Sequence, residues 1–138
     1  EDDVVWWNAM IAGYIENKLT DSAFELFRLM LLGSVLPNYA TIANILPICS
    51  SLGGLEGYHL GRQIHCYVLR RAELSSEVTV VNSLLSCYLR VGNFEGAETL
   101  FRNMKSKDLV SWNSMIAGYA ANGEWSKTLN FFGEFTKE

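Results

Sequence analysis

The same eight-residue segment occurs twice in this chain, and this repetition restricts the possible folds more than any other feature. Residues 7–14 read WNAMIAGY and residues 112–119 read WNSMIAGY, so seven of the eight positions are identical. The copies lie 105 residues apart, which is too far for one supersecondary unit, and weaker copies are expected between them. Residues 82–88 keep the Asn, the apolar pair and the Tyr, and residues 43–46 form a more distant copy. Counted from Asn8, Ala43, Asn82 and Asn113, the equivalent positions of the four copies, the starts lie 35, 39 and 31 residues apart, so we predict four tandem repeats.

Each repeat is expected to form two helices joined by a turn. In the first repeat, the apolar residues at helical spacing in the first helix are Val5, Met10, Ile11 and Tyr14. The apolar face of the second helix is formed by Ala23, Leu26, Phe27 and Met30. Thr20 or Asp21 is the expected N-cap of that second helix. A single helix pair cannot bury its apolar face alone, so neighbouring pairs must stack. The predicted fold is all-α, a right-handed α-solenoid of helix–turn–helix repeats with about eight helices in four repeats.

The turns and the close packing positions also recur. Ten residues after each start, three repeats have Gly and the first has Lys18 instead; the glycines are Gly53, Gly92 and Gly123. Fifteen residues after the start come small residues that allow close helix packing, at Ala23, Ala97 and Thr128. The second repeat reaches its small residue, Gly61, only after eighteen. We therefore predict an insertion of about three residues between Gly54 and Leu60.

The charge balance restricts the kind of partner. The chain has 15 acidic and 11 basic residues, a net charge of −4, which argues against purely electrostatic binding to nucleic acid. No run approaches the roughly 18 apolar residues of a membrane span. The first residue is not Met and residues 1–3 are acidic, so we expect a fragment of a longer chain without a visible signal peptide.

These repeats resemble a known family in their motifs as well as in their lengths. The first repeat contains VVWWNAMIAGYIENKLTDSAFELFRLM, the second contains GRQIH at residues 61–65, and the third contains VVNSLLSCYLRVGNFEGAETLFRNM. They resemble the pentatricopeptide repeat, specifically the plant class that alternates P, L and S motifs. The related tetratricopeptide repeat is disfavoured because its Trp–Leu–Gly–Tyr pattern is missing.

The resemblance covers nearly the whole chain and divides it into four units. Residues 4–38 resemble a P-type repeat of 35 residues, and residues 39–77 an L-type repeat with a short insertion. Residues 78–108 resemble an S-type repeat of 31 residues, and residues 109–138 a truncated P-type repeat. Repeats of this family bind RNA with one base per repeat. The resemblance therefore implies sequence-specific binding of single-stranded RNA.

The resemblance also implies which residues contact the RNA. The fifth residue of each motif, expected at a base edge, is Asn8, Ala43, Asn82 or Asn113. The last residue, expected at the same edge, is Asn38, Glu77 or Asp108, and the fourth unit has none. The second residue, expected to pack on base faces, is Val5, Ala40, Thr79 or Val110.

Family pairings then imply a short recognition sequence. Asn82 with Asp108 implies uridine, because a carboxylate only accepts hydrogen bonds. Asn8 with Asn38 implies cytidine with uridine tolerated, and Asn113 implies a pyrimidine. Ala43 with Glu77 offers little selectivity. Because N-terminal repeats of this family face the 5′ end of the RNA, the expected sequence is pyrimidine, any base, U, pyrimidine. An Asn at this position could instead be structural and bond only the neighbouring repeat.

Beyond RNA, the resemblance implies a role as the specificity tract of an organellar C-to-U editing factor, in the mitochondrion or alternatively the chloroplast. Small editing cofactor proteins would bind through the L-type repeat. No catalytic residue, cofactor, metal or small-molecule substrate is predicted, since the chain lacks the H-x-E and C-x-x-C pattern of a zinc deaminase. His59 and His65 have no cysteine at zinc spacing and are expected in packing or surface positions. The acidic balance favours the alternative, an α-solenoid scaffold that binds proteins rather than bases.

Overall fold

The computed structural model of the chain describes residues 2–52 and 54–137. In these two stretches all regular secondary structure is helical, as predicted. The helices, in chain order, are α1 (Asp2–Glu16), α2 (Thr20–Leu32), α3 (Tyr39–Leu52), α4 (Gly54–Leu69), α5 (Ala72–Ser75), α6 (Val78–Arg90), α7 (Phe94–Arg102), α8 (Leu109–Ala121) and α9 (Trp125–Lys137).

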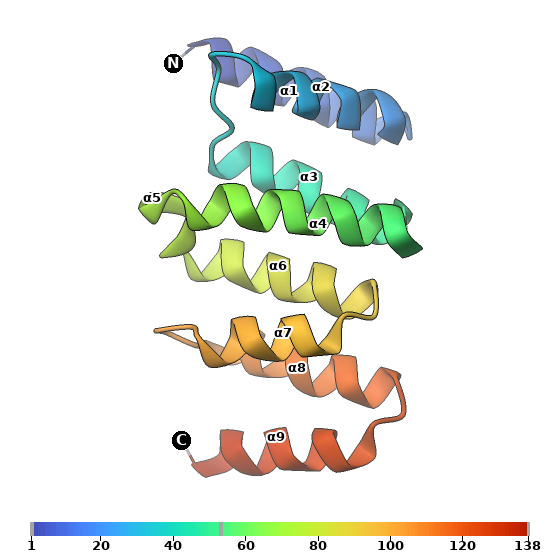
Figure 1. Cartoon of the computed structure of the whole chain (residues 1–138), viewed down its shortest axis with the longest axis vertical. Helices are drawn as coiled ribbons and strands as arrows, with labels where there is room; N and C mark the ends of the chain where they lie inside the picture. Colours follow the sequence, from blue (N-terminus) through green and yellow to red (C-terminus); the bar gives the residue numbers. More distant parts are fainter. Residues whose placement is uncertain (1, 53, 138) are drawn as a thin grey trace.

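The helices stack in two layers along the longest axis of the molecule (Figure 1). α1, α3, α6 and α8 pack against one another in succession and form one layer. α2, α4, α7 and α9 each pack against the helix that begins their own repeat, and α2, α4 and α7 lie nearer the viewer in Figure 1. This arrangement is an α-solenoid, in which each repeat contributes one helix to each layer.

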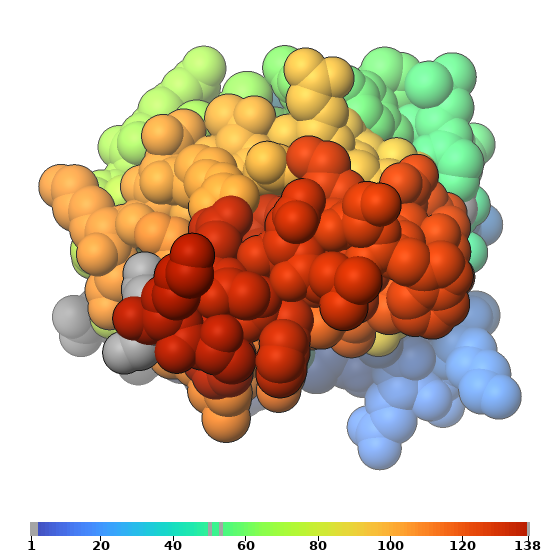
Figure 2. Space-filling model, turned by 90° about the horizontal axis from the view of Figure 1, so that it is seen from below, coloured from blue at the N-terminus to red at the C-terminus, as the bar shows by residue number. Residues whose placement is uncertain are grey.

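The apolar core runs through the whole stack because each helix turns one apolar stripe toward its neighbours. Ile11 of α1 and Phe27 of α2 are fully buried at one end, and Phe101 of α7 and Phe131 of α9 at the other. Leu100 packs against both of the clusters to which these residues belong, so the core is continuous. Figure 2 looks onto the end formed by α8 and α9. The apolar residues of α9 that remain exposed are Trp125, Leu129 and Phe132.

The two matching segments differ in burial because they occupy different places in the stack. Trp112 and Tyr119 of α8 are buried, as expected for core residues. Trp112 meets Phe101 edge to face at a centroid distance of 4.8 Å. In α1, Trp7 is only partly buried and Tyr14 is exposed. Ile11 is fully buried, but Val5, Met10 and Tyr14 are exposed, and α1 packs mainly on α2 and α3 among the described helices.

The turns between the paired helices need left-handed backbone, which explains the recurring glycine. Gly92 and Gly123 have φ angles of 84° and 75°, and Lys18 adopts the same region at 61°. In the second repeat the left-handed residue is Gly54, at 47°, while the predicted Gly53 lies outside the described residues. The predicted N-cap of α2 is wrong. α2 begins at Thr20, and Leu19, which gives no side-chain cap, occupies the N-cap position because the turn ends one residue earlier than expected.

The second repeat has a structure that the sequence only partly indicated. The prediction of about eight helices missed α5, a single turn whose Leu74 is buried. α4 has 16 residues where α2 has 13, so the residues of the predicted insertion lie in the first turns of a longer helix. Gly57 lets α4 approach α3 closely: a Cβ there would lie 2.3 Å from the Cys49 carbonyl oxygen. Gly61 likewise faces the Cys87 Sγ of α6, 3.0 Å from where its Cβ would be.

Candidate nucleic-acid interface

A polar cluster joins the first two repeats where α1 meets the start of α3. The Asn8 Nδ2 donates a hydrogen bond to the Asn38 Oδ1 at 3.0 Å. The Asn8 Oδ1 accepts one from the Thr41 hydroxyl. Asn8 is 9% exposed and Thr41 is fully buried, so the contact between these two residues is shielded from competition by water. The fifth and last residues of the first unit therefore lie together, as the sequence predicts for a base-reading pair.

One backbone group fixes the orientation of both amides in this cluster. The Thr41 N–H donates to Asn38 at 3.2 Å, and a backbone N–H can only donate, so the acceptor must be the Asn38 oxygen. That oxygen then requires a donor from Asn8, which places the Asn8 Nδ2 toward Asn38 and the Asn8 Oδ1 toward the Thr41 hydroxyl. The Asn38 Nδ2 and the second N–H of Asn8 are left without an acceptor among the described residues.

The third and fourth repeats contain the same cluster with one chemical difference. The Asn82 Nδ2 donates to the Asp108 Oδ1 at 2.9 Å, and the Ser111 hydroxyl donates to the Asn82 Oδ1 at 2.6 Å. Asp108 also caps α8, because its Oδ1 accepts from the Ser111 N–H while the Ser111 Oγ accepts from the Asp108 N–H. The hydrogen bond from Asn82 contributes most to lowering the pKa of Asp108. Asp108 is therefore ionised near neutral pH, and its Oδ2 remains as an acceptor.

The other two predicted positions lack such a cluster. Ala43 and Glu77 are both exposed, and Glu77 precedes α6 without a side-chain cap. The residue that corresponds to Thr41 and Ser111, at the third position of the repeat that follows Ala43, is Val80, which is buried and apolar. Asn113 is exposed on α8. The structure thus brings together two of the predicted pairs and leaves Asn113 without a second member.

The residues predicted to pack on base faces all lie at the surface. Val5 and Val110 are 62% and 55% exposed, and Ala40 and Thr79 are exposed as well. Each precedes the fifth residue of its repeat by three positions on the same helix, so it lies beside that residue on one face. The Thr79 Oγ1 accepts a hydrogen bond from the Tyr39 hydroxyl at 2.9 Å, which links α3 to α6. Small and apolar side chains flank both polar clusters.

A shallow cavity of about 150 Å³ lies between α3 and α6. It is lined by Pro47 of α3 and by Ser83, Ser86 and Arg90 of α6, together with Leu46 and Cys87. Ser83 follows Asn82 directly, and Arg90 is the basic residue in the last turn of α6. Hydroxyl and guanidinium groups therefore lie on the same helix as the third repeat's Asn.

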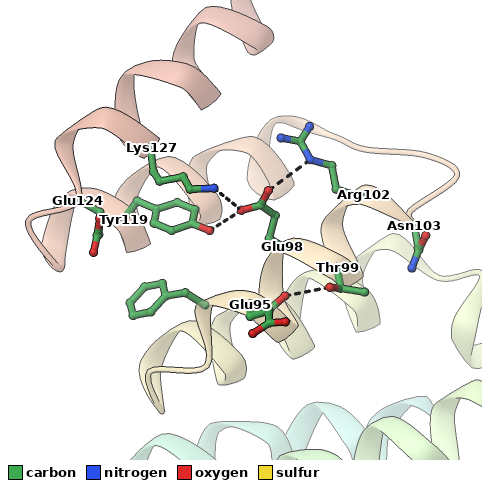
Figure 3. Close-up of a pocket in the computed structure, with 9 residues that line it drawn as sticks. Glu95, Glu98, Thr99, Arg102, Asn103, Tyr119, Glu124 and Lys127 are labelled. Atoms are coloured by element: carbon green, nitrogen blue, oxygen red, sulfur yellow. Dashed lines mark hydrogen bonds and ion pairs between the residues drawn. The ribbon is translucent and has the colours of Figure 1, made fainter.

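A cavity of about 640 Å³ lies elsewhere, between α7 and α9 (Figure 3). The Glu98 Oε1 accepts hydrogen bonds from the Tyr119 hydroxyl at 2.8 Å and from the Lys127 Nζ at 3.2 Å. Arg102 lies 3.8 Å from the other Glu98 oxygen, and it also forms a two-point contact with Glu134. The Tyr119 hydrogen bond is the main cause of the lowered Glu98 pKa. These charged groups pair with one another, so the network ties α7 to α8 and α9.

The two histidines occupy the packing and surface positions expected of them. The His65 Nδ1 lies 2.6 Å from the Tyr88 hydroxyl, and burial lowers the pKa of His65. His59 is exposed. Across residues 2–52 and 54–137, no cluster of three or more His, Cys, Asp or Glu side chains could hold a metal ion. In the same part of the chain no helix has the length and apolarity to cross a membrane.

Helix pairs stacked in this way define a helical-repeat protein. The model of the PPR repeat family matches residues 2–49, and the PPR repeat model matches residues 79–109 and 110–138. The chain belongs to the pentatricopeptide repeat (PPR) family, whose members generally bind RNA.

The chain is similar to several PPR-containing proteins of Arabidopsis thaliana. It is 54% identical over 132 residues to one of them, which covers 96% of the chain and 16% of that relative. It is 42% identical over 120 residues to a chloroplastic relative, covering 87% of the chain and 13% of the relative. With a mitochondrial relative it shares 37% identity over 130 residues, covering 94% of the chain and 23% of the relative. The chain thus spans less than a quarter of the length of each of these proteins.

The sequence prediction missed Thr41 and Ser111. Both are the third residue of the repeat that follows an Asn-containing repeat, and both are fully buried. A signal was available in the repeat alignment, because a hydroxyl residue stands at this position after Asn8 and Asn82 and a valine stands there after Ala43.

Proposed function

We propose that this chain binds single-stranded RNA and distinguishes bases through its first and third repeats. The observation that carries the proposal is the pair of matching polar clusters at Asn8 and Asn82. In each, the protein occupies one hydrogen of the Asn amide and its oxygen, and leaves the second N–H for a ligand. Asn therefore contributes to the contact between repeats, as the structural alternative requires, and still offers one donor to a base.

The outward atom of the last residue determines the preferred base. At the third repeat this atom is the Asp108 Oδ2, an acceptor. Uracil presents an N3–H donor beside carbonyl oxygens, whereas cytosine presents an unprotonated N3. A carboxylate acceptor next to the Asn82 N–H matches the donor–acceptor pattern of uracil. The third repeat is therefore proposed to select uridine over cytidine.

At the first repeat the corresponding atom is the Asn38 Nδ2, a donor. This donor matches the cytosine N3, and the second N–H of Asn8 matches a neighbouring carbonyl oxygen. A uracil carbonyl can also accept from the same amide, so uridine is tolerated. The second repeat, with Ala43 and Glu77, is proposed to accept any base, and the fourth, through Asn113, to prefer a pyrimidine.

The surface around the clusters supports the same function. Base faces can rest on the exposed Val5, Ala40, Thr79 and Val110. Ser83, Ser86 and Arg90 line the cavity between α3 and α6, and hydroxyl and guanidinium groups commonly contact phosphates. With a net charge of −4, the chain has few basic residues that could displace counterions from the RNA. The sequence-independent part of the binding is therefore expected to be weak, and discrimination between bases is expected to rest on the contacts to the base edges.

We further propose that the chain is part of a P–L–S repeat array that selects a site for C-to-U editing in an organellar transcript. The unit lengths and motif order support this class, and relatives named as chloroplastic and mitochondrial make either organelle suitable, with the mitochondrion preferred. The chain would select the site and take no part in the chemistry, and small editing cofactor proteins would bind through its L-type repeat.

Binding of fluorescent RNA oligomers tests the proposal. The chain should bind a pyrimidine–any–U–pyrimidine RNA more tightly than poly-A at both low and moderate salt, and the preference should survive as salt weakens both. Replacing only the third base of the RNA with C, A or G should reduce affinity about tenfold, because a mismatched base leaves hydrogen-bonding groups unpaired. Equal binding to all these RNAs would exclude base reading and favour the protein-binding scaffold.

A further inference from the structure

A buried hydroxyl group holds the amide in each of the two polar clusters. The Thr41 Oγ1 accepts from the Asn38 N–H at 3.1 Å, and the Ser111 Oγ accepts from the Asp108 N–H at 3.1 Å. A hydroxyl has a single hydrogen. Thr41 gives its hydrogen to the Asn8 Oδ1, and Ser111 gives its hydrogen to the Asn82 Oδ1.

This hydrogen bond has a direct consequence for what the Asn presents to RNA. An Asn side chain can rotate by half a turn about its last bond and exchange its oxygen and nitrogen. A hydroxyl donor aimed at the oxygen opposes that rotation, because the turned amide would place an N–H against another hydrogen-bond donor. With Ser111 in place, the Asn82 amide therefore keeps its N–H groups toward Asp108 and toward the ligand.

We propose that the third residue of the following repeat, Thr41 for Asn8 and Ser111 for Asn82, is a specificity-determining positioning residue for the base read by the preceding repeat. This inference rests on the proposed RNA function. The positioning residue does not touch the base. Together with the last residue of the preceding repeat, it holds the Asn amide in the orientation that presents an N–H to the base, so a base-reading unit contains three residues from two repeats rather than two.

The second repeat supplies an internal comparison. Where the fifth residue is Ala43, with no amide to orient, the third residue of the next repeat is Val80. Valine has nearly the shape of threonine and lacks the hydroxyl, and Val80 is buried in the core. The hydroxyl is thus present with Asn and absent with Ala.

Helix capping alone does not account for these hydroxyls. α6 begins after Glu77 without any side-chain cap hydrogen bond, so a helix at this place in the repeat forms without one. The reciprocal cap at α8 also requires only Asp108 and Ser111. Ser111 also donates a hydrogen bond to Asn82 on the neighbouring repeat. Capping does not need this bond, which instead holds the Asn82 amide in place.

Removal of one hydroxyl gives the first test. RNAs that differ only in the third base are titrated against the chain, its Ser111→Ala variant and its Ser111→Thr variant. The wild-type preference of about tenfold for U over C should fall to about twofold or less in Ser111→Ala and persist in Ser111→Thr, which restores the hydroxyl. The base read by the first repeat should be discriminated as before in all three proteins, a result that a general loss of structure would not give.

Installation of the cluster in the second repeat gives a test that does not depend on a destabilising change. The variant Ala43→Asn/Glu77→Asp is compared with the same variant carrying Val80→Thr. The triple variant should gain a preference for U at the second base, several times larger than that of the double variant.

The outcomes separate the two proposals. If the wild-type chain shows no preference for U at the third base, the proposed function is wrong. If it does prefer U, a Ser111→Ala protein that folds and keeps the full preference would overturn the positioning role. A triple variant that is no more selective at the second base than the double variant would overturn it as well.

Discussion

Replacing Asp108 with Asn should change the base preference of the third repeat while leaving its protein contacts in place. The Asp108 Oδ1 accepts from the Asn82 Nδ2 at 2.9 Å and from the Ser111 N–H at 3.0 Å. An Asn amide oxygen can accept the same hydrogen bonds, as Asn38 does in the first repeat. The atom that changes is therefore the outer one. It is the acceptor Oδ2 in Asp108 and the donor Nδ2 in the Asn variant.

The size of the effect follows from that single atom. A well-placed pair of hydrogen bonds to a base edge discriminates by about tenfold or more. Exchange of an acceptor for a donor removes the match to the uracil N3–H and creates one to the cytosine N3. We expect the ratio of U to C affinities at the third base to fall by at least about tenfold. The variant also loses a negative charge, which should strengthen binding slightly and equally for all the RNAs in addition to the effect on the base, so the ratio of U to C affinities is the diagnostic quantity.

The assay is a competition titration with RNAs that differ only at the third base, checked by circular dichroism for unchanged helix content. The reciprocal variant Asn38→Asp is the matched control, and it should move the first base toward U without affecting the third. An unchanged U to C ratio in a folded Asp108→Asn protein would refute the assignment of the outer atom. A change at both bases together would refute the independence of the repeats.

Three further predictions concern stability and are checked by thermal or chemical unfolding. Gly57→Ala should lower the free energy of unfolding by about 1–3 kcal/mol because the added Cβ meets the α3 backbone. Gly13→Ala, where the Cβ meets nothing within 4 Å, should raise it by up to about 1 kcal/mol, and equal effects of these two changes would contradict the close approach of α3 and α4. Lys18→Gly should raise the same free energy by up to about 1 kcal/mol since it relieves a left-handed φ of 61°, and a loss would show that the turn is not strained. The guanidinium of Arg102 lowers the pKa of Glu134 below its ordinary value of 4.5, so this pair stabilises the fold above that pH and the stabilisation disappears as pH falls through the lowered pKa. Glu134→Gln should therefore be less stable than wild type at neutral pH, by no more than about 1 kcal/mol at this exposed site, and the difference should vanish once the pH has fallen through the lowered pKa of Glu134; a difference that persists after the carboxyl is protonated would contradict the ion pair.

Some features of the fold were predicted correctly from the sequence, and others were not. The repeat spacing correctly predicted an all-helical stack, because each short amphipathic helix can bury its apolar stripe only against a neighbour of the same kind. The Gly pattern located the left-handed turns at Gly92 and Gly123, and Lys18 proves to adopt the same conformation. The prediction failed at α5 and at the N-cap of α2, where local propensity is weak and packing decides where a helix starts.

The polar clusters at Asn8 and Asn82 required three-dimensional contacts between repeats. The sequence named Asn8, Asn82 and their partners through family resemblance, but it offered no account of how the amides are held. Thr41 and Ser111 lie 33 and 29 positions from the Asn that each one contacts. A contact at that separation exists only once two neighbouring repeats have stacked.

The sequence by itself determined the repeat unit, the helical class and the positions that vary from one repeat to the next. Those properties follow from residue spacing, which is fixed along the chain before any folding. Tertiary structure alone decided which atoms of the Asn amides are used by the protein and which remain for a ligand. The reason is that hydrogen-bond occupancy depends on the direction of approach of a neighbouring helix, which is set by the packing of α1 on α3 and of α6 on α8.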